Sequence, residues 1–129
     1  MFAVMKILIA EDSSTVRRLI AARLAVDGYE VIEAEDGHTA LELVFSERPD
    51  LVVLDKVMPT LDGFEVVRAI REREETRNLP IVMLSDRVSE DDVLDGLDLG
   101  VDEYMPKPFS PHELSRRVRR ALERTTATR

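Results

Sequence analysis

The sequence predicts an α/β fold in which helices cover both faces of one parallel sheet. Strand and helix signals alternate along the chain, an order typical of parallel sheets. Residues 51–55, with the sequence Leu-Val-Val-Leu-Asp, form an apolar run without alternation, which is typical of a strand buried on both faces. Parallel crossovers are right-handed almost without exception, so we expect helices on both faces of the sheet.

Five strands are predicted from runs of β-favouring residues bounded by turn residues. They cover residues 4–10, 29–34, 51–55, 81–84 and 101–105. The second strand alternates apolar and polar side chains, whereas the third is apolar up to its terminal Asp55. The fourth runs directly into Ser85.

The first helix is expected between a cap at Ser13 or Ser14 and a stop signal at residues 27–28. Its inward face is expected to hold four apolar residues at helical spacing: Val16, Leu19, Ile20 and Leu24.

Four more helices are predicted at about residues 37–46, 63–74, 90–99 and 111–124. Ser89 with Asp92 resembles a capping box at the start of the fourth helix. Ser110, followed by Pro111 and Glu113, gives a strong start signal for the last.

The length and composition indicate one globular domain. The 129 residues suit a domain at residues 1–124, with 125–129 as a tail or the start of a linker. The absence of cysteine excludes disulfides and thiolate metal sites. The net charge of −8 argues against direct nucleic-acid binding, because domains that bind nucleic acid carry a basic patch. No apolar run approaches the roughly 18 residues of a membrane span, so we expect a cytoplasmic protein with no membrane contact.

Polar residues follow four of the predicted strands. Glu11-Asp12 follow the first, Asp55 ends the third, Ser85 ends the fourth and Lys107 follows the fifth. In an open parallel sheet the ligand site lies outside the carboxyl ends of the strands. The sequence therefore predicts that these side chains, distant along the chain, project from one edge of the sheet.

These residue types suit phosphoryl transfer. Close carboxylates repel each other unless a cation lies between them, and hard oxygen ligands without His or Cys suit Mg²⁺. Lys107 adds a fixed positive charge and Ser85 adds a hydroxyl donor. Asp55 is then the expected nucleophile, which gives an aspartyl phosphate. The chain has no Gly-rich phosphate loop, so ATP is not expected as the direct donor.

On these residues, together with Pro59, Gly63 and Lys107-Pro108-Phe109, the chain resembles the response-regulator receiver domains of two-component signalling, close to the single-domain chemotaxis type. The resemblance covers about residues 5–124. It implies a flavodoxin-like, doubly wound sheet of five parallel strands in the order 2-1-3-4-5, with five helices.

The resemblance also implies a role for each site residue. Asp55 accepts a phosphoryl group from a histidine kinase or a phosphotransfer protein. Asp12 binds Mg²⁺ directly, Glu11 binds it through water, and the backbone carbonyl of Val57 is the third protein ligand; Mn²⁺ is expected to substitute.

The remaining implied roles concern switching. Ser85 bonds a phosphoryl oxygen and Lys107 pairs with it, while Tyr104 is the aromatic switch residue and turns inward. The surface of the fourth helix, fifth strand and fifth helix then rearranges for a downstream protein or a fused output domain. Apart from the resemblance, a dimer through the fourth and fifth helices stays open, and no sequence feature supports it. Phosphorylation and dephosphorylation are self-catalysed, so the chain is expected to be a signalling protein and not an enzyme.

Two other function classes compete with this one. A receiver-like scaffold that binds a partner without phosphorylation stays open as the alternative. A metal-dependent phosphatase with an Asp nucleophile is discounted, because it lacks a second Asp two residues after Asp55, where the chain has Val57.

Several charged residues depart from the pattern or lie outside it. Asp86 stands where the family usually has a small residue, and we expect its charge to repel an incoming dianion or to bind a cation. Lys56 lies beside the nucleophile, and Arg87 is a candidate partner for Asp86. His38 and His112 are expected to be exposed. A basic stretch in the last helix is expected to be a solvated face: Arg116, Arg117, Arg119 and Arg120.

Overall fold

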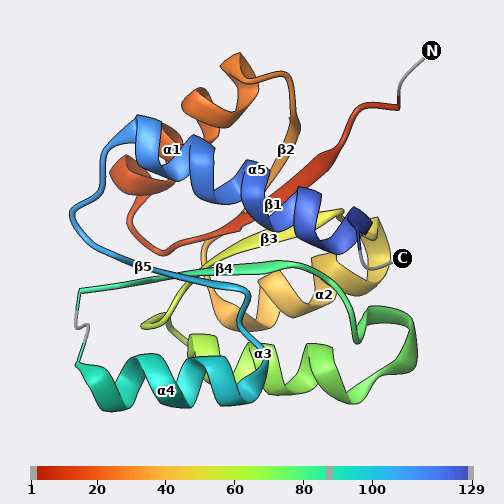
Figure 1. Cartoon of the computed structure of the whole chain (residues 1–129), viewed down its shortest axis with the longest axis vertical. Coiled ribbons are helices and arrows are strands. Elements are labelled where there is room, and N and C mark those ends of the chain that lie inside the picture. The colour runs from red at the N-terminus through yellow and green to blue at the C-terminus, as the bar shows by residue number, and fades with distance from the viewer. Residues whose placement is uncertain (1–2, 87–88, 128–129) are drawn as a thin grey trace.

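A computed structural model describes residues 3–86 and 89–127 of the chain and shows one parallel sheet with the order β2-β1-β3-β4-β5 (Figure 1). Its strands are β1 (Lys6–Ala10), β2 (Glu30–Ala34), β3 (Leu51–Asp55), β4 (Ile81–Ser85) and β5 (Glu103–Pro106). All four pairings are parallel, so the carboxyl ends of the strands lie along one edge. The predicted fold class and strand order are confirmed.

The helices lie in two layers, one on each face of the sheet. They are α1 (Ser14–Val26), α2 (Gly37–Glu47), α3 (Gly63–Glu72), α4 (Glu90–Leu99) and α5 (Pro111–Ala127), with a short 3₁₀ helix η1 (Glu74–Thr76). Figure 1 shows α1 and α5 on one face and α2, α3 and α4 on the other. The prediction that helices cover both faces is therefore confirmed.

The central strands separate two hydrophobic layers. Successive side chains point to opposite faces of a strand, and every residue of β3 and β4 is buried. Leu8, Val52 and Met83 pack toward α2 and α3, whereas Ile9, Val53 and Leu84 pack toward α1 and α5. Each fully buried side chain of this size contributes about 1.5–3 kcal/mol. The layers hold the strands in register and so fix the edge where the polar residues meet.

The orientation of α1 differs from the prediction in one residue. Leu19 was expected to face inward, but it is 67% exposed. The buried residues of the helix are Arg17, Ile20 and Leu24. These three have the i, i+3, i+7 spacing of one helical face. Leu19 lies outside that face, because the polar Arg17 occupies a position that the apolar pattern had not assigned.

Several element boundaries also differ from the predictions. β1 begins at Lys6 rather than residue 4, and β5 covers Glu103–Pro106 rather than 101–105. α3 ends at Glu72, η1 follows from Glu74, and α5 continues to Ala127. The sequence pattern is weakest at the ends of helices and strands, which accounts for these shifts. The topology of the sheet is not affected by them.

Side-chain caps begin the helices next to the site. Ser13 caps α1 through a bond from the amide of Val16, and Ser89 caps α4 through a bond from the amide of Asp92. Asp36 caps α2, and Asp62 forms a reciprocal capping box with α3 residue Glu65, two caps that the sequence analysis missed. Caps of this kind satisfy amide donors that the helix leaves unpaired.

Gly63 brings the start of α3 against the end of β3. A Cβ atom at this position would lie 2.6 Å from the carbonyl oxygen of Asp55 and 2.8 Å from Cα of Lys56. The amide of Gly63 donates to the carbonyl oxygen of Lys56 at 2.7 Å. The backbone can approach this closely only because residue 63 has no side chain.

Replacing Gly63 is expected to destabilise the fold. The Gly63→Ala methyl group would meet backbone atoms that cannot turn aside, and overpacking of this kind costs about 1–3 kcal/mol. Urea unfolding measures the free energy of unfolding, with Ser46→Ala on the exposed face of α2 as the control. The control is expected to change it by less than about 0.5 kcal/mol. Equal stability of Gly63→Ala and the parent chain would contradict the role of this close approach.

Candidate functional site

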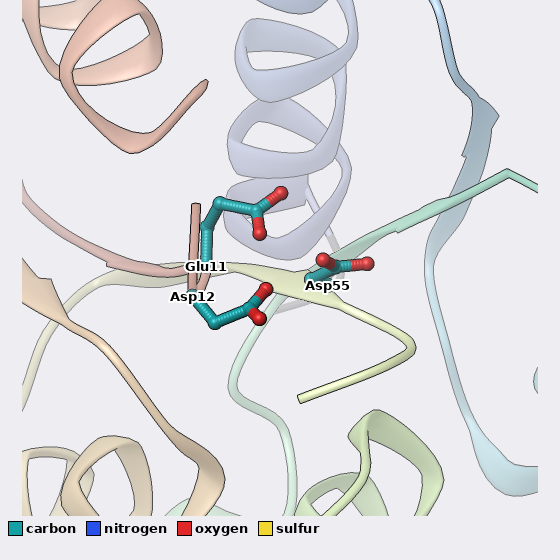
Figure 2. Close-up of side chains that lie close together, drawn as sticks. All are labelled: Glu11, Asp12 and Asp55. Carbon is teal, nitrogen blue, oxygen red and sulfur yellow. The ribbon is translucent and has the colours of Figure 1, made fainter. Parts of the chain in front are cut away.

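Three carboxylates meet where β1 and β3 end (Figure 2). Glu11 and Asp12 follow β1, Asp55 is the last residue of β3, and one oxygen from each lies within 4.8 Å of the others. Glu11 is 1% exposed and Asp55 is 5% exposed, whereas Asp12 is exposed. The structure thus brings together the acidic residues that the sequence placed at one edge.

Lys107 joins this acidic cluster from the end of β5. Its Nζ donates to Oε1 of Glu11 at 2.7 Å and to Oδ2 of Asp55 at 3.0 Å. Burial disfavours the charged ammonium, but the hydrogen bonds to Glu11 and Asp55 outweigh burial and raise the pKa of Lys107. The lysine therefore stays protonated and neutralises part of the carboxylate charge.

The cluster keeps excess negative charge beside Lys107. Three carboxylates face one ammonium, and desolvation, followed by the neighbouring Glu11 carboxyl, raises the pKa of Asp12. Oxygen ligands in such a group suit a hard divalent cation. Asp12 and Asp55 have the donor atoms to hold Mg²⁺, and exposure of Asp12 leaves a route from solvent. The Glu11 carboxylate already pairs with Lys107, and this pairing is compatible with a contact from Glu11 to a metal ion through water.

Val57 lies in the loop after Asp55 and is 71% exposed. Its amide donates to Oδ1 of Asp55 at 3.4 Å, so the loop folds back on the carboxylate. The assignment of its carbonyl oxygen as a metal ligand stays a prediction.

Arg17 holds the backbone next to the cluster, a role that the sequence analysis missed. The residue is 7% exposed, and its Nη1 donates to the carbonyl oxygen of Glu11 at 2.8 Å. Its Nε donates to Oε1 of Glu33 at 3.0 Å, just beyond the centre of β2. A buried guanidinium with these partners fixes the turn that carries Glu11 and Asp12. The signal available in the sequence was the position of Arg17 on a helix face that is otherwise apolar.

Ser85 and Tyr104 occupy the neighbouring strands. Ser85 is the last residue of β4 and is 3% exposed, and its carbonyl oxygen accepts a bond from the amide of Lys107 at 2.8 Å. Tyr104 pairs in register with Met83 of β4 and is 8% exposed. Ser85 thus ends the strand that pairs with β3, next to the residue in register with Asp55, and Tyr104 lies farther from that edge of the sheet. Their switching roles stay predictions.

Lys56 points toward α4 and does not contact the acidic cluster. Its Nζ donates to Oδ1 of Asp92 at 2.8 Å and lies 4.9 Å from the centre of the Phe64 ring. Asp86 is exposed and borders an apolar groove that Lys107 also lines. The suggested partner Arg87 lies outside the described residues.

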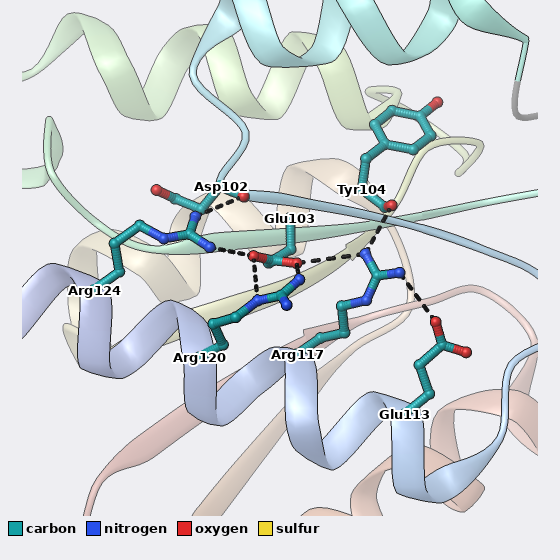
Figure 3. A network of polar contacts seen from close by, with 7 residues as sticks. All are labelled: Asp102, Glu103, Tyr104, Glu113, Arg117, Arg120 and Arg124. Carbon is teal, nitrogen blue, oxygen red and sulfur yellow. Dashed lines mark hydrogen bonds and ion pairs between the residues drawn. The ribbon is translucent and has the colours of Figure 1, made fainter.

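A second charged cluster, around Glu103, lies between β5 and α5 (Figure 3). Glu103 is 5% exposed and receives bonds from Arg117 at 3.4 Å, from Arg120 at 2.7 and 3.1 Å, and from Arg124. Arg116 and Arg119 are exposed, as expected for a solvated face, but Arg117 and Arg120 are not simply solvated.

The sequence of the chain matches that of a known family. The family model described as the response regulator receiver domain matches residues 7–119, so the chain belongs to that family. It is a receiver domain of the two-component response regulators.

Similar proteins agree with this assignment. The chain is 48% identical over 92% of its length to "Probable transcriptional regulator ycf27" of Galdieria sulphuraria. It is 40% identical over 92% of its length to the phosphate regulon transcriptional regulatory protein PhoB of Pseudomonas aeruginosa. These matches cover 46% and 52% of the relatives, so the chain spans about half the length of the curated relatives it matches.

Solved structures give the same family. Chemotaxis response regulator CheY4 of Vibrio cholerae has a TM-score of 0.88 and 33% identity, over 92% of this chain and 99% of that one. The receiver domain of Francisella response regulator 1452 also has a TM-score of 0.88, with 34% identity, over 94% of this chain and 98% of that one. Among the described residues, we find no helix that is both long and apolar enough to span a membrane.

Because of the Glu103 cluster, the free energy of unfolding should depend on pH in the acidic range. Burial would raise the pKa of Glu103, but hydrogen bonds from Arg120 and Arg124 outweigh it and lower the pKa from 4.5. A lowered pKa contributes stability above the unfolded value and loses it as pH falls through the folded value. The contribution of Glu103 is therefore full at neutral pH and declines below about pH 4.5.

Glu103→Gln is expected to lower the free energy of unfolding by about 1–3 kcal/mol at neutral pH, and the difference should shrink in acid. Urea unfolding at several pH values measures it. Glu123→Gln, which removes an exposed partner of Arg119, is the control and should have little effect. A difference between Glu103→Gln and the parent chain that is constant down to about pH 3 would rule out this ionisation.

Proposed function

We propose that this receiver domain takes a phosphoryl group onto Asp55 from the phosphohistidine of a histidine kinase or a phosphotransfer protein, with Mg²⁺ bound. The observation that carries the proposal is the contact of Lys107 with both Asp55 and Glu11, in a cluster that also includes Asp12. This arrangement combines a nucleophilic carboxylate, a fixed cation and candidate metal ligands within a few ångströms.

In the proposed transfer, a carboxylate oxygen of Asp55 attacks phosphorus and forms a P–O bond. The P–N bond to the donor histidine breaks, and its electron pair stays on the imidazole nitrogen. Lys107 already contacts Oδ2 of Asp55 at 3.0 Å, so its charge is placed to stabilise the transferred oxygens. The hydroxyl of Ser85 is proposed to donate to one of them.

Asp12 and Asp55, with the Val57 carbonyl, are the proposed direct ligands of Mg²⁺, and Glu11 is proposed to act through water. The ion would supply positive charge that neutralises the phosphoryl oxygens as they approach the carboxylates. Arg17 supports this arrangement because it holds the Glu11 backbone. Water attack on the acyl phosphate would end the signal without another protein.

The proposed output surface comprises α4, β5 and α5. α4 is acidic and exposes Leu94 and Leu97, which are 51% and 48% exposed. α5 carries exposed basic residues such as Arg116 and Arg119. Opposite charges beside exposed leucines suit a downstream protein, a fused output domain or a second copy of the chain. The half-length match to transcriptional regulators supports a fused output domain.

Incubation with phosphoramidate and Mg²⁺ tests the proposed function. The chain should gain the mass of one phosphoryl group, located at Asp55 by peptide mass spectrometry, and Asp55→Asn should gain none. Lys107→Ala should slow the reaction about 100-fold, as expected for the loss of a group that stabilises transferred charge.

Lys56→Ala is the matched lysine control, because Lys56 adjoins Asp55 in sequence but contacts Asp92 instead of the acidic cluster. Its phosphorylation rate should stay within about twofold of the parent rate, since a partly exposed pair contributes little. An unmodified parent chain would instead favour a scaffold that works without phosphorylation.

A further inference from the structure

The ring of Tyr104 packs in the layer between the sheet and α4. Figure 3 shows Glu103 directed toward the α5 arginines and Tyr104 directed to the opposite side of β5. Tyr104 is 8% exposed and belongs to the hydrophobic layer that includes Val101 and Met83. Among the described residues, its buried hydroxyl has no hydrogen-bond partner. Packing, and not a polar anchor, therefore holds the ring in this position.

Gly96 of α4 provides the space that the ring occupies. A Cβ atom at residue 96 would lie 2.9 Å from both Cδ2 and Cε2 of Tyr104, closer than carbon atoms pack. It would also meet Cε1 of Phe64 at 3.6 Å, an ordinary contact. Any side chain here would have to displace the Tyr104 ring or move α4 away from β5.

Helix propensity alone disfavours glycine at residue 96. Gly96 lies inside α4 with ordinary helical backbone, since its φ is not in the left-handed region that favours glycine. Apart from proline, glycine is the least favourable residue in a helix interior. Helix propensity does not explain why residue 96 is glycine, whereas the contact with the Tyr104 ring does.

We propose that Gly96 admits the Tyr104 ring to its buried position and so sets the balance between buried and exposed positions of this ring. The consequence for signalling rests on the proposed switch role of Tyr104. A Cβ atom at residue 96 would bias the ring outward, because the buried hydroxyl has no bond that resists the movement. Residue 96 then determines how readily β5 and α4 reach the state with the ring buried.

The test uses the composition of the chain. It has two tyrosines and no tryptophan, so in a Tyr29→Phe background Tyr104 is the only strong fluorophore. Acrylamide quenching of its emission measures the exposure of the ring. Gly96→Ala is expected to lower the ratio of buried to exposed ring about tenfold and to raise the quenching constant accordingly. Asp95→Ala, at an exposed position of the same helix, should leave quenching unchanged.

A double-mutant cycle separates the ring contact from helix propensity. Alanine is the better helix former, so Gly96→Ala should raise the urea midpoint when Tyr104→Ala has removed the ring, and lower it when the ring is present. If Gly96→Ala alone fails to fold, the double variant should regain the fold. Unchanged quenching in Gly96→Ala, or equal effects of this change with and without the ring, would overturn the proposal.

These measurements need no phosphoryl donor, so they give the same result if Asp55 is never phosphorylated. The signalling consequence is tested separately with phosphoramidate and Mg²⁺. If the parent chain is phosphorylated and its quenching falls, Gly96→Ala should show a smaller fall, and an equal fall would contradict the switch role of residue 96. Failure of the parent chain to be modified would contradict the proposed function alone.

Discussion

The ammonium group of Lys107 between Glu11 and Asp55 is the interaction on which the site depends. The side chains of Glu11 and Asp55 are 1% and 7% exposed, and an unpaired buried charge costs several kcal/mol. Contacts of 2.7 and 3.0 Å to one lysine offset that cost and join the ends of three strands. The same contacts leave the three carboxylates with less positive charge than they need, and a divalent cation would supply the difference.

β5 connects this site to the far surface of the domain. Glu103 packs toward the α5 arginines, Tyr104 packs against Gly96 of α4, and Lys107, just after the strand, reaches the acidic cluster. Residues of this short strand, or directly after it, thus contact the acidic cluster and both helices. The pair between Lys56 and Asp92 gives a second connection, from the end of β3 to the first turn of α4.

Much of the fold and the centre of the site could be predicted from the sequence. Apolar runs placed the strands, and parallel topology alone brought Asp12, Asp55 and Lys107 to one edge. The missed features depend on how helices rotate against the sheet, which the apolar pattern fixes only coarsely. Arg17 therefore replaced Leu19 on the inward face of α1.

The partners of the charged residues also depend on how each helix is rotated and on where long, flexible side chains point. Three arginines from α5 converge on Glu103 because residues 117, 120 and 124 share one helical face, but the buried partner is on another element. The sequence does not determine where the Lys56 side chain points, because a flexible lysine beside Asp55 can reach either the site or α4. Only the packed structure decides between such partners.

Titration with Mg²⁺, followed by amide chemical shifts or calorimetry, most directly tests the claim that the acidic cluster is built around a deficit of positive charge. We expect one saturable site in the parent chain and at least about tenfold weaker binding in Asp12→Asn, with Asp98→Asn on the exposed face of α4 as an unchanged control. Equal Mg²⁺ affinity in Asp12→Asn and the parent chain would contradict it.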